Sequence, residues 1–346
     1  MTKHAYFSKL ERDWGIVTLA QDFMPDEVRN NFALAMDAQP ALVSTASAGI
    51  PAWMTYYVDP EVIRVLQAPN EGAEILGEVR KGDWTTKVAM FPVVENTGTI
   101  ASYGDHNEDG RSDANATWPQ RQSYLFQTNI EYGDLEVDQA AEGRLNWVSE
   151  LQVSAAQTLT KFQDYTYHFG VAGLQCYGLL NDPSLSAALT PATKAAGGTV
   201  WINGNVIVAT ANEVYADIQA MFSQLVSQTK GRVKAKDKIT LAMSPGSEVA
   251  LTATNSFGVN VSDLLKKNFP NLEVKTSIRY ATVSGNVVQM IADKFDGKQT
   301  GYCAFNEKMR DHRLIPATSS FRQKKTSGTF GAIIRYPVAI SQMLGV

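Results

Sequence analysis

RLNWVSELQVSAAQTLTKFQDYTYHF, residues Arg144–Phe169, contains neither glycine nor proline and lies between Gly143 and Gly170. Its apolar side chains recur at intervals of three and four residues and form one stripe: Leu145, Val148, Leu151, Ala155, Leu159, Phe162, Tyr165 and Phe169. At about 1.5 Å per residue, a helix of this length is roughly 40 Å long. The pattern therefore predicts one long helix with a buried face.

Two strands and a polar connection precede this helix. Residues Ser123–Val137 alternate between two faces, with Tyr124, Phe126, Thr128, Ile130 and Tyr132 on one of them. An earlier strand is predicted at Trp84–Val94, and the connection between the two strands, Glu95–Arg121, is rich in Gly, Asn, Asp and Ser. We expect a long two-stranded ribbon with a polar tip, which needs a surface to lie against because an isolated ribbon is marginally stable.

The segment after the long helix alternates helices with strands. A capping box at Thr210–Glu213 predicts a helix that stops at Gly231, and Ser262 is predicted to cap a second helix that ends at Pro270. Strands are expected at Lys238–Met243, Leu272–Tyr280, Val287–Phe295 and Gly328–Ile340. This order is typical of an α+β fold rather than of a repeating βαβ array.

The N-terminal region is less regular. A short helix is predicted at Pro25–Met36, and Ala41–Tyr57 carries aromatic residues without helical or strand periodicity. An extended arm that packs on another surface and an ordinary loop that covers its own domain both fit this pattern. The N-terminus lacks a secretory signal and no apolar run is long enough for a membrane span, so we expect the protein to fold in the cytosol without a membrane partner.

The composition limits the functional classes. The 346 residues are 44% hydrophobic and 19% charged with a net charge of −4, so the strong basic excess of a protein that grips nucleic acid is absent. Cys176 and Cys303 have no metal-ligand spacing and are expected to be buried free thiols. A protein that encloses DNA without binding particular sequences remains compatible with this charge.

Few residues suggest catalysis. His168 and Cys176 could form a nucleophilic pair, but His168 is more simply explained by its place near the C-terminus of the long helix, where positive charge is favoured. Basic residues at every second position from Lys230 to Lys238 could line one face of an extended segment, although a solvated turn explains them with less effort. We therefore predict no catalytic residue and no cofactor.

One acidic motif resembles a calcium loop. Asp105, Asn107 and Asp109 occupy positions 1, 3 and 5, Gly110 occupies position 6, and Asp113 occupies position 9. Position 12, where a bidentate Glu should close the site, is Ala116. We favour a solvated acidic tip over a metal site. A cytosolic metal-dependent α+β enzyme that uses this loop is the rival interpretation from a different functional class.

Several short motifs resemble one branch of the major capsid proteins of tailed bacteriophages. They are Gly82–Asp83–Trp84, Tyr103–Gly104–Asp105, Trp118–Pro119–Gln120–Arg121 and, most specifically, GLQCYGLLNDP at Gly173–Pro183. The order of elements is similar to that of the Johnson fold, which these capsid proteins share with encapsulin nanocompartments. The resemblance covers essentially the whole chain.

The resemblance implies a division of the chain. It places an N-terminal arm at residues 1–60, the start of a peripheral domain at 61–83 and a ribbon called the E-loop at 84–137. The peripheral domain with its spine helix would follow at 138–190, then an axial domain at 191–300, and the peripheral domain would return at 301–346.

The resemblance also implies a function. The chain would self-assemble into pentamers and hexamers that close an icosahedral virion shell around double-stranded DNA, with the help of a separate scaffolding protein and a portal. Ribbon and arm would contact neighbouring subunits, and Tyr103, Trp118, Trp53 and Tyr56 are the expected contact residues because aromatic side chains dominate interface energetics. An encapsulin-like shell around a protein cargo is the nearest alternative.

Overall fold

The computed structural model describes residues 71–143, 145–204 and 206–346. The predicted arm, the predicted helix Pro25–Met36, the segment Ala41–Tyr57, and the candidates Trp53 and Tyr56 lie outside the described residues. Residues 135–147 group with the N-terminal region in one unit, and Asn70–Asp134 with Val148–Val346 form a second unit. No helix of the described part is long and apolar enough to cross a membrane.

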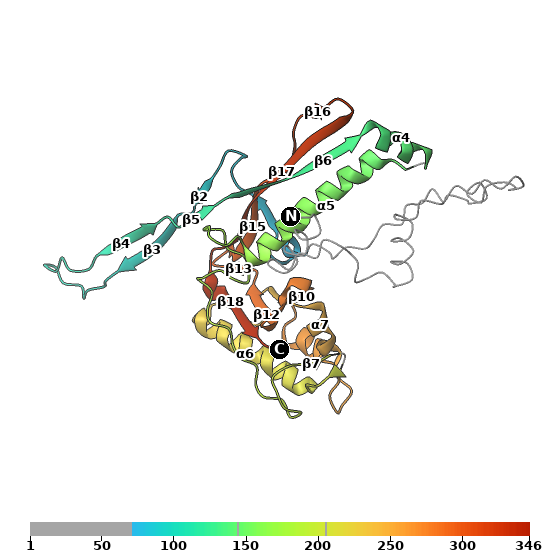
Figure 1. The fold of residues 1–346 in the computed structure, drawn as a ribbon. Helices are drawn as coiled ribbons and strands as arrows, with labels where there is room; N and C mark the ends of the chain where they lie inside the picture. Colours follow the sequence, from blue (N-terminus) through green and yellow to red (C-terminus); the bar gives the residue numbers. More distant parts are fainter. Residues whose placement is uncertain (1–70, 144, 205) are drawn as a thin grey trace, which may run out of the picture. The chain divides into compact units, whose positions relative to one another are not determined.

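The first sheet of the second unit combines strands that are far apart in the sequence. Its order is β1 (Glu78–Arg80), β15 (Gly301–Asp311), β17 (Ser320–Ile334) and β16 (Ile315–Pro316), and β6 (Tyr124–Gly133) also pairs with β17. The β6–β17 ladder is antiparallel and runs from Tyr124 opposite Thr329 to Gly133 opposite Ser320. Figure 1 shows β6 beside β17, so the strand that leaves the ribbon is held by a strand near the C-terminus.

The long helix α5 (Trp147–Phe169) packs on this sheet. The Phe162 ring lies 4.6 Å from the Phe126 ring and 6.0 Å from the Tyr124 ring, measured between centroids. Ala155 and Leu159 are buried, as the predicted stripe requires, and Tyr124, Phe126 and Ile130 are less exposed than the residues between them. The long helix and the inward face of β6 are therefore confirmed.

The second sheet supports the largest apolar core. Strand β9 (Ile239–Met243) lies between parallel β10 (Leu272–Thr276) and antiparallel β12 (Gly285–Ala292), and β12 also pairs with β18 (Ile340–Leu344) and β11 (Ala281–Thr282). Helix α6 (Ala211–Gln228) buries Val214, Ile218, Met221 and Leu225 against this sheet. Its predicted start is confirmed, because the Thr210 N–H donates to Glu213 Oε2 over 2.8 Å.

Short elements complete the second unit. They are α3 (Gly72–Leu76), α7 (Pro245–Glu248), α8 (Val261–Asn268), the 3₁₀ turns η3 (Val249–Thr252), η4 (Ile278–Tyr280) and η5 (Pro337–Ala339), and the strand pairs β7 (Ile202–Asn203) with β8 (Val206–Ile207) and β13 (Lys294–Phe295) with β14 (Lys298–Gln299). Helix α4 covers Asp134–Glu142, and all of it after Asp134 belongs to the other unit. In that unit the Trp147 indole N–H donates to Glu136 Oε1 over 2.7 Å.

Several predicted boundaries before α5 are wrong. The strand expected at Ser123–Val137 ends at Gly133, because Asp134 begins α4. The strand expected at Trp84–Val94 begins at Val88, since the Thr86 N–H donates to the Asp83 carbonyl and closes a turn. Pro92 then separates β2 (Val88–Met90) from β3 (Val93–Gly98), because proline has no N–H for a ladder. Helix α5 begins at Trp147 rather than Arg144.

Later boundaries also differ. Asn260, not Ser262, precedes the first residue of α8, and Ser262 lies within the helix. Strand β10 stops before Ser277, whose hydroxyl accepts from the Arg279 N–H and opens η4. The predicted strand Val287–Phe295 is two strands, β12 and β13, and Gly328–Ile340 covers only the end of β17 and the start of β18. In the last case β17 begins eight residues earlier because it pairs with β6.

Candidate assembly surfaces

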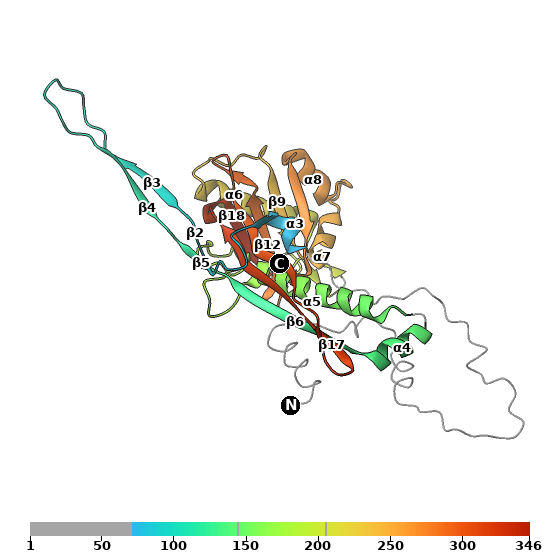
Figure 2. The ribbon, with the colours of Figure 1, turned by 90° about the horizontal axis from the view of Figure 1, so that it is seen from above.

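The ribbon is the most exposed part of the second unit. Strand β2 pairs with β5 (Gln120–Gln122), and β3 pairs with β4 (Ser112–Thr117) from Val93 opposite Thr117 to Gly98 opposite Ser112. Every residue of β3 and β4 is exposed. Figures 1 and 2 both show β3 and β4 extending away from the two sheets of their unit. Because backbone pairing does not require apolar side chains, much of the polar segment predicted as a connection is strand.

Apolar side chains are exposed along this ribbon. Ile100 is fully exposed, Tyr103 is 94% exposed and Trp118 is 58% exposed. Met90, Val93 and Val94 are exposed as well. A soluble monomer rarely exposes a run of apolar groups on one thin element, and such a surface is typical of one that another molecule covers.

The acidic candidates lie in and beside the loop that joins β3 to β4. The Tyr103 hydroxyl donates to Asp105 Oδ1 over 2.9 Å, and the Asp109 N–H donates to Asn107 Oδ1 over 2.9 Å. Asp113 belongs to β4 and its Oδ1 accepts from the Ala114 N–H. Within the described residues, no three His, Cys, Asp or Glu side chains converge as a metal ion would require. Local hydrogen bonds thus account for the side chains of Asp105, Asn107 and Asp113.

The base of the ribbon is attached to the body from both strands. On the β2 side, Ala89 and Phe91 pack against the buried cluster that contains Tyr302 and Phe330. On the β5 side, the Gln122 N–H donates to the Gln175 carbonyl over 3.0 Å, and the Gln175 N–H donates back to Gln122 Oε1 over 3.2 Å. The ribbon therefore leaves the body from a defined attachment point.

An ion pair reinforces this attachment. Arg121 Nη2 lies 3.1 Å from Asp182 Oδ2, and the Arg121 guanidinium lies 4.9 Å from the Tyr177 ring centroid. The Asp182 side chain is fully buried and the Arg121 side chain is 16% exposed. Two motifs singled out separately in the sequence, Trp118–Arg121 and Gly173–Pro183, are thus in direct contact. Their spacing in the sequence carries no signal of this contact.

The second of these motifs also closes the end of α5. Asn181 Oδ1 accepts from the Gly178 N–H over 2.7 Å, and Asn181 Nδ2 donates to the Phe169 carbonyl over 2.5 Å. A side chain at Gly178 would meet the His168 backbone within 2.2 Å, so only glycine allows this close approach. The motif is consequently a rigid link between α5 and the base of the ribbon.

His168 belongs to a buried polar cluster below that link. Its Nδ1 donates to the Asp164 carbonyl over 2.9 Å, which leaves Nε2 to accept from the Ser277 hydroxyl over 3.1 Å. Burial lowers the pKa of His168, and burial raises the pKa of Cys176 to about 12. The neutral imidazole is therefore favoured, contrary to the expectation of a positive charge at this helix end. A thiol with so high a pKa is a poor nucleophile.

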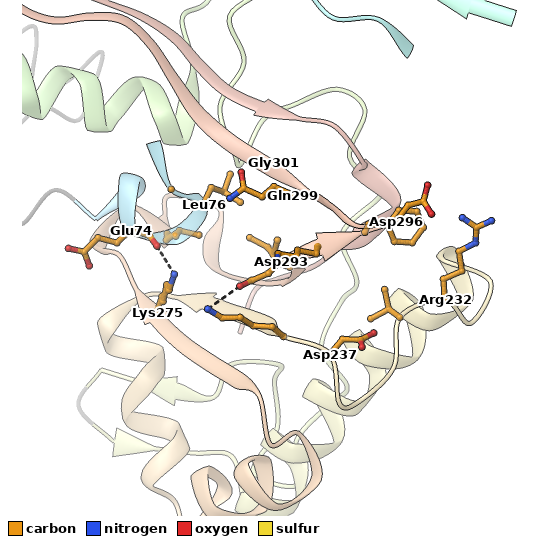
Figure 3. A pocket seen from close by; sticks show the side chains of 16 residues that line it. Glu74, Leu76, Arg232, Asp237, Lys275, Asp293, Asp296, Gln299 and Gly301 are labelled. Atoms are coloured by element: carbon orange, nitrogen blue, oxygen red, sulfur yellow. Dashed lines mark hydrogen bonds and ion pairs between the residues drawn. The ribbon is translucent and has the colours of Figure 1, made fainter. Parts of the chain in front are cut away.

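A pocket of about 720 Å³ lies between the two sheets of the second unit. Figure 3 shows Lys275 reaching the Glu74 backbone and a lysine reaching Asp293; Lys275 Nζ donates to the Glu74 carbonyl over 2.6 Å, and Lys238 Nζ lies 3.4 Å from Asp293 Oδ2. The wall carries both cationic and anionic side chains, so the pocket presents no excess of one charge that would select a ligand. It is a polar junction between the sheets.

The alternating basic residues lie in the turn between α6 and β9. Lys230 has a positive φ of 52°, and the Lys234 N–H donates to Asp237 Oδ2 over 2.8 Å. The segment is therefore not extended, and the interpretation as a solvated turn is confirmed. The expectation that Cys176 and Cys303 are buried free thiols is confirmed as well.

Comparison with known proteins decides what these surfaces belong to. A family model described as "Pa193 gp26 major capsid protein" matches residues 41–345. The chain belongs to this family. It is a major capsid protein that forms the icosahedral shell of a bacteriophage, and its place is the virion. The resemblance noted in the sequence is confirmed, and the interpretations as a protein-cargo shell and as a metal-dependent enzyme are set aside.

Solved capsids share the fold of this capsid protein at low sequence identity. The capsid of Myoviridae Phage XM1 matches with a TM-score of 0.72 and 14% identity, over 86% of this chain and 99% of that chain. The capsid of a native GTA particle matches with a TM-score of 0.58 and 12% identity, over 87% and 100%. Gordonia phage Cozz matches with a TM-score of 0.54 and 10% identity, over 89% and 98%. No curated protein matches the chain.

Proposed function

We propose that the ribbon is the principal contact between neighbouring subunits of the shell, lying across an adjacent copy of the chain. The exposed fraction of its apolar side chains supports this. In a single subunit, the side chains of Ile100, Tyr103 and Trp118 are exposed to water and contribute little stability through burial. Self-association follows from membership of a capsid family.

Tyr103 and Trp118 are the proposed anchors of this contact. Both are large aromatic side chains at exposed positions, the kind that contributes most to interface stability once water is excluded. Trp53 and Tyr56, which lie outside the described residues, are proposed as further intersubunit contacts on the strength of the resemblance. Asp105, Asn107, Asp109 and Asp113 are proposed to be solvated residues of the tip rather than metal ligands.

The finer organisation of the shell is also part of the proposal. The first sheet with α5 would form the peripheral domain, and the second sheet with α6 would form the axial domain. Subunits would assemble into pentamers and hexamers around double-stranded DNA without sequence-specific contacts. A separate scaffolding protein and a portal are the proposed partners during assembly. The net charge of −4 supports an inner wall that does not hold DNA tightly.

The test is to shorten the ribbon without disturbing the body. Replacing residues 99–111 with Asn–Gly joins Gly98 to Ser112, which already face each other in the β3–β4 ladder, through a two-residue turn. We expect a soluble subunit with unchanged circular dichroism that forms no closed shells in negative-stain images or sedimentation. Normal shells from this variant would refute the proposed role of the ribbon.

A further inference from the structure

We propose that Arg121 is a positioning residue that sets the direction of the ribbon before a subunit joins the shell. This inference rests on the proposed function of the ribbon and names the contact that aims it. At the base of the ribbon, a charged contact and an apolar contact attach the two strands to the body.

The charged contact has a defined geometry. Arg121 lies in β5, its Nη2 is 3.1 Å from Asp182 Oδ2, and its guanidinium lies over the Tyr177 ring at 4.9 Å. A planar guanidinium held by a carboxylate and a ring face has little freedom to rotate. Since the Asp182 side chain is fully buried, water cannot readily replace Arg121 as its partner.

The body side of this contact is rigid. Asp182 Oδ1 accepts from the Ser184 N–H over 2.9 Å and also from the Ser184 hydroxyl. The adjacent Asn181 is tied to the Phe169 carbonyl at the end of α5, and the Tyr177 carbonyl accepts from the Ala332 N–H of β17 over 2.9 Å. The carboxylate and ring that receive Arg121 are therefore fixed to the long helix and to the first sheet.

The other attachments constrain direction less strongly. Ala89 and Phe91 make apolar contacts, which are non-directional. Gln122 and Gln175 exchange two hydrogen bonds, but these are partly accessible to water. Beyond the base, β3 and β4 are exposed along their whole length. Among the attachments that the described residues make at the base, Arg121 is thus the one that combines charge, burial and planarity.

Leverage makes a small error at the base large at the tip. Gly98 lies ten residues after Val88 along β2 and β3, which is roughly 33 Å for an extended chain at about 3.3 Å per residue. A tilt of about 10° at the base would move the tip by about 6 Å. Because protein interfaces are closely packed, a displacement of this size would prevent an aromatic side chain at the tip from being buried against a neighbouring subunit. A ribbon without its charged contact would sample directions that do not match a neighbouring subunit.

The experiment measures direction in the unassembled full-length subunit. Spin labels on Ser102→Cys at the tip and Thr158→Cys on the exposed face of α5 report the distance between ribbon and body; the buried native cysteines should not react. Arg121→Met and Asp182→Asn should broaden the distance distribution and lower the yield of closed shells by about tenfold. Arg121→Lys, which keeps the charge but not the planar fork, should lie between these variants and the wild type.

The matched control is Arg322→Met. It makes the same substitution as Arg121→Met, but at an arginine whose ion pair with Glu131 on the first sheet is exposed. It should change neither the distance distribution nor the shells. A narrow, unshifted distribution in both Arg121→Met and Asp182→Asn overturns the proposal; if Arg121→Met does not fold, Asp182→Asn and Arg121→Lys decide. A broad distribution with normal shells overturns the claim that assembly needs a preset direction. The separate replacement of residues 99–111 decides whether the ribbon is an intersubunit contact at all.

Discussion

The ribbon and helix α5 are both long elements of the same subunit, and they differ in what stabilises them. Helix α5 buries Ala155, Leu159 and a set of polar side chains within its own chain. Strands β3 and β4 bury none of their residues. Folding of the subunit therefore buries one face of α5, whereas the apolar side chains of the ribbon stay exposed and available for contacts with other subunits. Substitutions should separate stability from assembly along this line.

The largest expected effect on folding is at Leu159 in α5. Its side chain is 3% exposed, so Leu159→Ala should lower the free energy of unfolding by about 2–5 kcal/mol through lost burial and a cavity. Chemical denaturation followed by circular dichroism measures this. Leu135→Ala, at a position 71% exposed, is the matched control and should change stability by less than about 0.5 kcal/mol. Equal effects at both positions would contradict the assignment of the stripe to the core.

A smaller effect, on assembly alone, is expected in the ribbon. Tyr103→Ala and Trp118→Ala should leave the unfolding midpoint unchanged, because both side chains are exposed in the subunit. Each should raise the critical concentration for shell formation about tenfold, which corresponds to about 1.4 kcal/mol per contact. Light scattering against protein concentration measures it, with Ser102→Ala as the control in the same loop. If these substitutions lowered the stability of the subunit without impairing assembly, they would contradict the claim that the ribbon aromatics contribute to assembly and not to folding.

The smallest expected effect concerns metal. The side chains of Asp105, Asn107 and Asp113 accept local hydrogen bonds. No three acidic, His or Cys side chains of the described residues converge as a metal site would require, and Ala116 supplies no closing carboxylate. Millimolar chelator and Asp109→Ala should therefore leave assembled shells intact in sedimentation. Dissociation under both treatments would show that the tip holds a cation between subunits.

Elements with strong periodicity could be predicted from the chain alone. The stripe of α5, the alternation of β6 and the capping box at Thr210 each depend on neighbours within a few residues, and all three are present in the structure. The ends of the strands were harder to predict. Strand β6 ends at Gly133 because α4 begins at the next residue, and β17 begins as early as Ser320 because it pairs with β6. Local patterns specify which element forms, while its ends depend on partners far away in the sequence.

The base of the ribbon and the polar cluster of α5 show what required the tertiary structure. Arg121 and Asp182 are 61 residues apart, and His168 and Ser277 are 109 residues apart, so no periodicity connects either pair. Burial then decides their chemistry, because it removes the water that would otherwise weaken the ion pair and lowers the pKa of the imidazole. The amino-acid pattern was sufficient for the fold class and the capsid resemblance. The direction of the ribbon and the neutral state of His168 follow only from contacts that folding creates.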